Sequence, residues 1–421
     1  MAKSASDLNR QLNRRLTAVG EWVDERMPVT EFWKKHISEY YAPKNFNLWY
    51  FFGSLSLLVL VNQLLTGIFL TMHYKPDAAA AFGSVEYIMR DVQWGWLIRY
   101  MHSTGASLFF VVVYLHMFRA LMYGSYQKPR ELIWILGVTI FLVLMAESFM
   151  GYVLPWGQMS YWGAQVIISL FGAVPYVGEI LVEWIRGDYL VADATLNRFF
   201  ALHVIALPLV LVLLVVLHLA ALHEVGSNNP EGVDIKAHKD SQGRPLDGIP
   251  FHPYYTVKDI FGASFFLLIA AFIIFFWPEG GGYFLKPDNF VQANPLVTPE
   301  HIPPVWYFTP YYAILQAVPD KLMGVVLMGA SVLILYLVPW LDRSPVRSLK
   351  YRSWPSKLAL AIFVVAFVRL GMLGLSQDSS TFELRLWTFL YFAFFALMPV
   401  WTRLEHTKPV PQRLGASESS S

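Results

Sequence analysis

Eight long apolar stretches constrain the fold of this chain more than any other feature. They cover residues 47–72, 98–122, 131–154, 196–222, 256–277, 320–341, 357–375 and 383–402. Each is long enough, or nearly so, for a helix to cross a hydrocarbon core about 30 Å thick, where backbone hydrogen bonds must be satisfied internally. The amphipathic stretch 156–190 is too polar to be a ninth span. The sequence therefore predicts an all-α polytopic membrane protein with eight transmembrane helices.

Composition excludes several functions. The 421 residues are 56% hydrophobic and carry a net charge of +2, which fits neither a soluble multidomain protein nor a nucleic-acid partner. The chain has no cysteine, so disulfides, iron–sulfur ligation and covalent attachment of c-type haem are excluded. Any haem is therefore expected to be held non-covalently. The N-terminal sequence has no apolar core with a small-residue cleavage site, so no removable signal peptide is expected.

The first residues and the basic side chains predict how the chain meets the membrane. Residues 6–26 place leucines and valines at helical spacing among arginines, which predicts an amphipathic helix lying on the membrane or packed against protein. Lysine and arginine concentrate in the N-terminal arm, in the connections after the second, fourth and sixth spans, and in the tail. The positive-inside rule therefore predicts that both termini are cytoplasmic.

Two histidine pairs lie within the second and fourth expected spans. His102 and His116 are fourteen residues apart, and His203 and His218 are fifteen apart. At about 100° and 1.5 Å per residue, each pair lies roughly on one helix face with its members about 21–22 Å apart. A single histidine in an apolar helix is more often a buried hydrogen-bonded residue, but ionisable groups inside a membrane are costly and usually functional. Two matched pairs favour two stacked metal or haem sites, each with one histidine from each helix.

Glycines repeat this period in the first and third spans. They are Gly53, Gly67, Gly137 and Gly151, separated within each span by the same fourteen residues as the first histidine pair. Glycine permits close helix packing, but four glycines at this period favour flat macrocycles lying against bare backbone. An iron with imidazole on both faces has no open axial position, so such haems would carry electrons and bind no gas.

Three further residues belong to this pattern. Arg99 and Arg119 each stand three residues from a histidine, where the guanidinium would either pair with a haem propionate or merely extend to the membrane surface. Pro208 lies between the two histidines of the fourth span. We expect a kink or a π-turn near Pro208 to absorb the extra residue in that spacing.

Six segments together have a familiar pattern. RYMHSTGAS, GYVLPWGQMSYWGA, LVEWI, ATLNRFFALH, LHEVGSNNP and FHPYYTVKD, in this order and spacing, resemble cytochrome b of the cytochrome bc complex, respiratory complex III. The resemblance runs from about residue 30 to 402, and the single chain with eight spans is similar to the respiratory form.

The resemblance implies a dihaem four-helix bundle formed by the first four spans, with two non-covalent haem b groups. His102 and His203 would hold the low-potential outer haem, and His116 and His218 the higher-potential inner haem. It implies ubiquinol oxidation at the outer face and quinone reduction at the inner face, coupled to proton translocation in a Q cycle. The implied partners are a Rieske iron–sulfur protein, cytochrome c1 and a second copy of the complex. The expected location is a bacterial inner membrane, with the mitochondrial inner membrane as the alternative.

For the outer quinol site, the resemblance implies a set of residues on two segments. They are Tyr152, Gly163, Pro304, Trp306, Tyr307 and Tyr312. The sequence departs from the family's usual Pro-Glu-Trp-Tyr because Val305 stands where the glutamate would be, and valine accepts no proton. Glu300 and His301 are the nearest substitutes, and the hypothesis is that Glu300 takes over part of the role.

For the inner quinone site, the resemblance implies His223, Ser227, Lys258 and Asp259. A histidine and an aspartate beside a quinone can hydrogen-bond its carbonyls and supply protons. The alternatives are interfacial anchors for Lys258 and Asp259 and a residue favoured by the helix dipole for His223.

The resulting domain organisation has five parts. They are an N-terminal cytoplasmic arm (1–46), the dihaem bundle (47–223), a cytoplasmic loop (224–255), a C-terminal four-helix region with the outer-site loop (256–402) and a disordered tail (403–421). Two other functions compete: a transporter using histidines as proton relays, and a membrane-anchor cytochrome serving an attached dehydrogenase. Neither needs both the histidine–glycine period and the aromatic outer loop.

Overall fold

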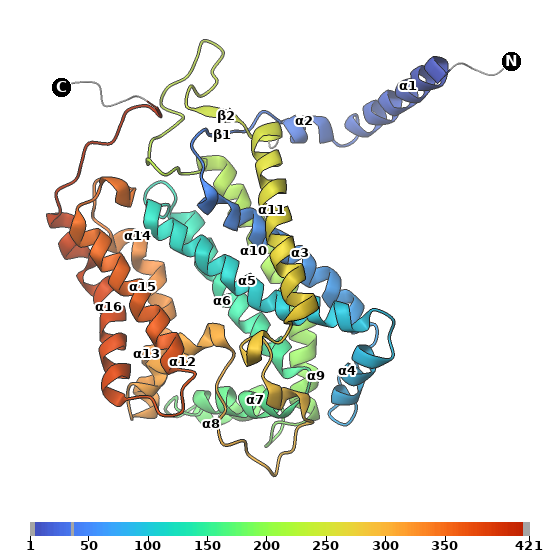
Figure 1. Ribbon diagram of the computed structural model, residues 1–421, viewed down its shortest axis with the longest axis vertical. Helices are drawn as coiled ribbons and strands as arrows, with labels where there is room; N and C mark the ends of the chain where they lie inside the picture. Colours follow the sequence, from blue (N-terminus) through green and yellow to red (C-terminus); the bar gives the residue numbers. More distant parts are fainter. Residues whose placement is uncertain (1–4, 35–37, 416–421) are drawn as a thin grey trace.

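Helices account for nearly all of the fold in this computed structural model, which describes residues 5–34 and 38–415 (Figure 1). Eight helices in the described part of the chain are long and apolar enough to cross a membrane. They cover Leu48–Thr71, Gly95–Tyr123, Glu131–Val153, Asp193–Val225, Phe251–Phe276, Lys321–Leu341, Trp354–Leu373 and Thr381–Leu404. Each overlaps one predicted stretch, so the number and order of the predicted spans are confirmed.

Several spans combine more than one helical element. The first four are η2 (Leu48–Tyr50) with α3 (Phe51–Thr71), α5 (Gly95–Tyr123), α6 (Glu131–Val153), and α9 (Asp193–Ala201) with η3 (Leu202–Ala206) and α10 (Leu207–Val225). The last four are α11 (Phe251–Phe276), α13 (Lys321–Leu333) with η7 (Ile334–Leu337) and α14 (Val338–Leu341), α15 (Trp354–Leu373) and α16 (Thr381–Leu404).

Shorter elements connect and flank the spans. The helices are α1 (Ala5–Asp24), α2 (Val29–Trp33), α4 (Ala81–Arg90), α7 (Gln158–Phe171), α8 (Gly178–Arg186) and α12 (Thr309–Gln316). The short helical turns are η4 (Gly280–Gly282), η5 (Pro287–Phe290), η6 (Trp306–Phe308) and η8 (Leu349–Tyr351), and the strands β1 (Tyr41–Pro43) and β2 (Gly248–Pro250) pair antiparallel.

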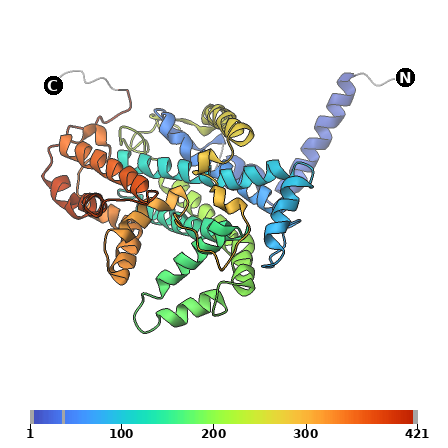
Figure 2. The ribbon, with the colours of Figure 1, turned by 60° about the horizontal axis from the view of Figure 1, so that its bottom comes forward.

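The spans form two packed groups that share one core. In the first group α3 packs on α5 and α6 packs on α10, and in the second group α12 packs with α13, α15 and α16 (Figure 1). The buried apolar cluster runs from Phe110 and Phe141 in the first group to Tyr391 and Phe395 in the second. The segment 156–190 forms α7 and α8, which lie across one end of the first group and come forward in Figure 2. The prediction that this segment is not a span is confirmed.

The predicted amphipathic helix is present as α1. It projects away from the helical body, with Val19 and Trp22 exposed (Figure 1). It therefore does not pack on the core of its own chain, and its position on a membrane surface stays a prediction.

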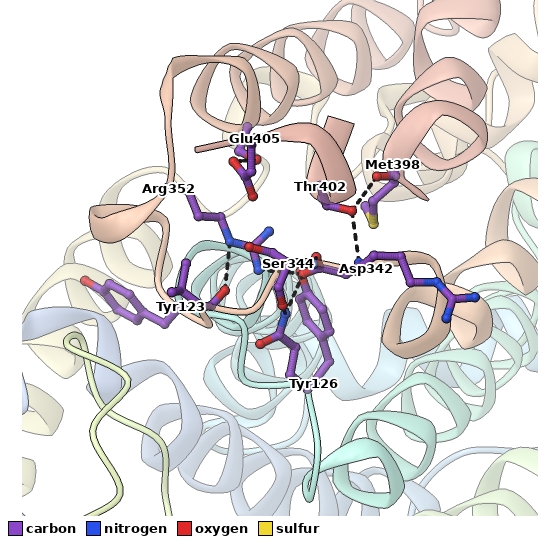
Figure 3. A network of polar contacts seen from close by, with 12 residues as sticks. Tyr123, Tyr126, Asp342, Ser344, Arg352, Met398, Thr402 and Glu405 are labelled. Atoms are coloured by element: carbon purple, nitrogen blue, oxygen red, sulfur yellow. Dashed lines mark hydrogen bonds and ion pairs between the residues drawn. The ribbon is translucent and has the colours of Figure 1, made fainter. Parts of the chain in front are cut away.

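A buried ion pair between Asp342 and Arg352 links the two groups of helices. The Asp342 carboxylate, after α14, accepts hydrogen bonds from Tyr126 at 2.7 Å and from the Arg352 guanidinium at 2.6 Å. The side chains of Asp342 and Arg352 are 0% and 6% exposed, and Figure 3 shows them converging beside the end of α16. Since Tyr126 follows α5, this carboxylate links the first group of helices to the second.

The tail corrects a prediction. We expected residues 403–421 to be disordered, but α16 continues to Leu404 and the chain then follows the protein surface until Leu414 is buried. Arg413 binds Asp247 at 3.0 Å, and Leu414 is buried against Val233 and Ile235 of the loop that follows α10. A buried carboxylate and a small apolar pocket thus order the tail, neither of which a composition-based prediction detects. Residues 416–421 lie outside the described part of the chain.

The contacts of Asp247 predict how tail docking depends on pH. Burial tends to raise the pKa of Asp247, but hydrogen bonds from Arg413 and Lys44 outweigh it and hold the pKa below its ordinary value of 3.8. A carboxyl with a depressed pKa contributes stability that is present above its unfolded pKa and is lost as pH falls through its folded pKa. We therefore expect the tail to stay docked at neutral pH and to detach below about pH 4.

Because the chain has no cysteine, a single spin label at Gln412→Cys can follow this transition. Label mobility should rise as the pH is lowered from 7 to 3. In an Asp247→Asn background the label should already be mobile at pH 7. An immobile label in that background would show that the carboxylate does not hold the tail.

Candidate functional site

The two histidine pairs of the sequence meet across the first group of helices. The ring centroids of His102 on α5 and His203 on η3 are 6.1 Å apart, and those of His116 on α5 and His218 on α10 are 6.4 Å apart. A metal bound at about 2 Å from a nitrogen of each ring would hold two imidazole centroids about 6 Å apart. Both pairs therefore have the separation that a two-imidazole metal site requires.

Each of the four periodic glycines faces a different histidine. A Cβ atom built on Gly67 would lie 3.3 Å from Cε1 of His102, and one built on Gly53 would lie 3.2 Å from Cε1 of His116. On α6, the corresponding contacts join Gly137 to His218 at 3.4 Å and Gly151 to His203. The structure thus brings the glycines and histidines together one to one, and any larger residue at these four positions would crowd a ring.

The fourth span contains the predicted π-turn. The η3 segment is a π-helix over Leu202–Ala206, and Pro208 lies in the first turn of the α-helix that follows. A π-turn holds an extra residue, so it realigns His218 with His203 despite their fifteen-residue separation. The prediction is confirmed, and the proline supplies the reason because it cannot donate to the carbonyl one turn earlier.

The arginines lie beside the rings. Arg99 lines the cavity that contains His102 and His203. The Arg119 guanidinium is 3.4 Å from Nδ1 of His116 and stacks over the Tyr50 ring at 4.6 Å. Its Nε is buried and has no hydrogen-bond partner in the described part of the chain. A buried guanidinium nitrogen without an acceptor suits a carboxylate ligand such as a propionate.

Hydrogen bonds fix two of the rings through Nδ1. His102 Nδ1 is 2.9 Å from the Thr66 hydroxyl, and His203 Nδ1 is 2.9 Å from the carbonyl oxygen of Glu147. Histidines that bind a metal usually have the other ring nitrogen held in this way, which leaves Nε2 as the ligand atom. Within the described residues no group of three or more histidine, cysteine, aspartate or glutamate side chains gathers around a bare metal ion. Paired imidazoles therefore suit a macrocycle that supplies the other ligands.

The His102–His203 pair, called the outer pair after its predicted orientation, opens into a cavity of about 240 Å³, called the outer cavity. Arg99, Tyr152, Val305 and Tyr307 line it together with the two histidines. The Tyr152 hydroxyl is buried and has no hydrogen-bond partner within residues 5–34 and 38–415, so it remains available to a ligand.

The aromatic loop before α12 is fixed to α5. The Tyr307 ring stacks on Phe110 with centroids 3.9 Å apart, and its carbonyl oxygen accepts a 2.6 Å hydrogen bond from Tyr114. Trp306 donates to the Ser107 hydroxyl at 3.2 Å. These contacts make the loop a rigid wall of the cavity.

The other predicted outer-site residues lie further from this cavity. Glu300 and His301 line a separate, more polar cavity with Lys286 and Asp288, and burial together with the Lys286 charge lowers the pKa of His301. Pro304 and Tyr312 are half-buried on either side of η6. A Cβ atom on Gly163, on α7, would meet nothing within 4 Å among the described residues.

The predicted inner-site residues lie near the end of α10, in the loop just after it, and on α11. The Tyr40 ring lies 4.5 Å from the His223 ring near the end of α10 and is hydrogen-bonded to Ser227, and burial raises the pKa of its hydroxyl. Lys258 and Asp259 lie on α11, where the Lys258 ammonium is 5.1 Å from the Tyr255 ring.

Comparison with known proteins decides the family. The model for cytochrome b/b6/petB matches residues 37–226, and the model for the C-terminal region of cytochrome b/b6/petD matches residues 292–395. The chain belongs to the cytochrome b family. It is 60% identical to cytochrome b of Allochromatium vinosum over 403 residues, covering 93% of this chain and 97% of that one.

Other cytochrome b proteins support the same conclusion. Cytochrome b of Rhodospirillum rubrum is 50% identical over 394 residues, covering 93% of this chain and 94% of the relative. A solved hyperthermophilic respiratory complex III contains a chain with a TM-score of 0.83 and 38% identity, covering 91% of this chain and 99% of that one. Membership of the cytochrome b family implies haem b binding, and the structural match implies a multi-subunit respiratory complex.

Sequence reasoning missed two residues of this cytochrome b. Glu147 lines the outer cavity and contacts His203, and an acidic residue inside an apolar span was a signal for it. Tyr40 touches two predicted inner-site residues but lies in an irregular segment far from both in sequence, where no periodicity marks it.

Proposed function

We propose that this cytochrome b holds two b haems between α5 and the span formed by η3 and α10, oxidises quinol at the outer cavity and reduces quinone beside His223. The observation that carries the proposal is the pair of imidazole couples, 6.1 and 6.4 Å between centroids, each ring facing its own glycine. When bound, the haems would supply one-electron transfer across the membrane.

The residues would divide the work of holding the haems. His102 and His203 would ligate the outer haem, and Gly67 and Gly151 leave room for the two imidazole rings. His116 and His218 would ligate the inner haem in the same way against Gly53 and Gly137. Arg99 and Arg119 would each pair with propionates at their own level, which would satisfy the buried nitrogen of Arg119.

At the outer site the protein binds, orients and shields the quinol. The stacked Tyr307 and Phe110 rings form an apolar wall that excludes water, and the unpartnered Tyr152 hydroxyl is positioned to bond a ring oxygen of the quinol. Trp306 helps to hold that wall in place through its hydrogen bond to Ser107, and Pro304 and Tyr312 flank the wall on either side of η6. Gly163 leaves α7 free of a side chain on its open face. Quinol oxidation releases two protons, and Val305 carries neither of them.

Glu300 is our proposed substitute acceptor for one proton. It lies in a polar cavity beside His301 and outside the first cavity, so a proton would reach it through Tyr152 or water. We expect Glu300→Gln to slow quinol oxidation several-fold and to alter its pH dependence, measured with the assembled complex. Gln377→Glu, in the same cavity, controls for a general change of charge. Unchanged rate and pH profile in Glu300→Gln would exclude this role.

At the inner site, His223 and Ser227 would bond one side of the quinone and Asp259 and Lys258 the other, supplying protons from the cytoplasmic phase. Tyr40 contacts both His223 and Ser227, so it would hold them in register. Together the two sites would run a Q cycle in which one electron leaves outward and the other crosses inward. Moving one electron against a membrane potential of 100 mV costs about 2.3 kcal/mol of free energy. The electron that leaves outward must therefore supply the driving force.

The remaining assignments follow from the same proposal. A Rieske iron–sulfur protein would accept the outward electron, because this chain has no cysteine for such a centre, and cytochrome c1 would follow it. The complex would be a dimer in a bacterial inner membrane with both termini of this chain cytoplasmic and ubiquinol as substrate.

Purification of the assembled complex tests the proposal. We expect two b haems per chain in a reduced-minus-oxidised spectrum, copurifying iron–sulfur and c-type subunits, and sensitivity to inhibitors of both quinone sites. A colourless preparation would favour a transporter. Haem with no outer-site inhibition would favour a membrane anchor for a dehydrogenase.

A further inference from the structure

Glu147 is a carboxylate placed against one ring of the outer histidine pair. Its Oε1 lies 3.0 Å from Nδ1 of His203, whose Nδ1 also lies 2.9 Å from the carbonyl oxygen of the same residue. Both side chains are 16% exposed, and the second carboxylate oxygen, Oε2, is buried without a hydrogen-bond partner among the residues that the structure describes. A carboxylate removed from water in this way is costly, so a strong interaction must offset its burial.

The other rings lack such a partner. His102 Nδ1 contacts the neutral Thr66 hydroxyl, and His116 Nδ1 faces the Arg119 guanidinium. Of the four paired histidines, His203 alone contacts a carboxylate in the described part of the chain. Each histidine pair also has an arginine nearby: Arg99 lines the outer cavity, and Arg119 lies against His116. The outer pair thus has a carboxylate against one ring, whereas the inner pair has a guanidinium against one ring.

We propose that Glu147 is a positioning residue that holds Nδ1 of His203 between its carbonyl oxygen and its carboxylate, and thereby lowers the reduction potential of the haem that the outer pair would bind. This inference rests on the proposed function, since it assumes that His203 ligates haem iron. A carboxylate hydrogen-bonded to a metal-binding imidazole fixes the ring and makes its other nitrogen a stronger donor. The oxidised iron carries one more positive charge than the reduced iron, so a stronger donor and a nearby negative charge both favour the oxidised form.

The direction of the effect suits electron flow across the membrane. An electron moves spontaneously from the lower-potential haem to the higher one. A carboxylate at the outer pair alone therefore favours transfer inward, away from the quinol cavity. The chain would thus set the order of the two potentials partly with a single side chain on α6.

The test compares Glu147→Gln, Glu147→Asp and the control Glu131→Gln in the assembled complex. Glu131 is on the same helix, in its first turn, sixteen residues from Glu147, so the control makes the same chemical change away from the outer pair. Each b haem is titrated potentiometrically, and the electron paramagnetic resonance signal of the oxidised outer haem reports the orientation of its axial rings.

We expect Glu147→Gln to raise the ratio of reduced to oxidised outer haem about tenfold at a fixed potential, which corresponds to about 59 mV for one electron. The inner haem should be unchanged. Glu147→Asp, which retains the charge on a shorter side chain, should give a smaller shift, and Glu131→Gln should give none.

Three outcomes would overturn the inference. They are an unchanged outer potential in Glu147→Gln with both haems retained, an equal shift of both haems, and loss of the outer haem from both Glu147 variants, which would assign a purely structural role. If the unmodified complex itself shows no pair of b haems, the proposed function fails instead, so the two failures are distinguishable.

Discussion

Replacement of His203 by leucine is expected to leave one b haem per chain in place of two. Leucine has nearly the volume of the imidazole but cannot ligate iron, so one of the two imidazoles that would hold the outer haem would be lost while the inner pair stays intact. His102, 6.1 Å away across the pair, would remain as a single ligand and would not hold the group through purification.

The measurement is the haem-to-protein ratio of the purified complex with the amplitude of its reduced-minus-oxidised spectrum, which should fall by half. Quinol oxidation should fall to background because the inward electron has no acceptor. His238→Leu is the matched control, since His238 is exposed in the loop after α10. A His203→Leu preparation that retains both haems with unaltered spectra would refute the ligation proposal.

The second large effect is expected on stability. Replacing Asp342 by alanine should destabilise the chain by about 3–5 kcal/mol, because it leaves the buried Arg352 guanidinium without its counter-charge. The same substitution removes the acceptor for the Tyr126 hydroxyl, so the link between the two groups of helices would be lost. The expected measurement is a lower apparent melting temperature of the detergent-solubilised complex.

Two further variants separate the contribution of the buried ion pair to stability from other effects of the substitution. Glu86→Ala breaks the pair that Glu86 makes with Arg90, whose side chain is 76% exposed, and should cost less than about 1 kcal/mol. The double variant Asp342→Leu with Arg352→Met removes both charges and should recover much of the lost stability, since apolar pairs of similar size often replace buried ion pairs at little cost. If Asp342→Ala melted at the same temperature as Glu86→Ala, the buried pair would not fasten the groups.

Local sequence patterns predicted most of the fold, because whether a segment spans a membrane depends mainly on the length and hydropathy of that segment alone. Each predicted apolar stretch overlaps an observed span, since helical hydrogen bonds in hydrocarbon are satisfied within the segment itself. The π-turn was predictable for the same reason, because Pro208 and the fifteen-residue spacing lie on one helix.

The tail shows where such reasoning stops. Composition predicted disorder from residue 403. Arg413, however, forms an ion pair with Asp247, and Leu414 packs on apolar side chains of the same loop, which lies more than 150 residues earlier in the sequence. The order of the tail depends on partner residues that are distant in sequence, and hydropathy and composition carry no information about such partners.

The sequence by itself determined the eight spans, their order, and the helix period that places the two histidines of each pair on one face of a span. Only the tertiary structure decided which glycine faces which histidine, that Glu147 rather than Glu300 shares the cavity with Val305, and that Tyr40 contacts His223. The physical reason is that periodicity fixes which side chains share a face of one helix, whereas the packing of one helix against another decides what each face meets.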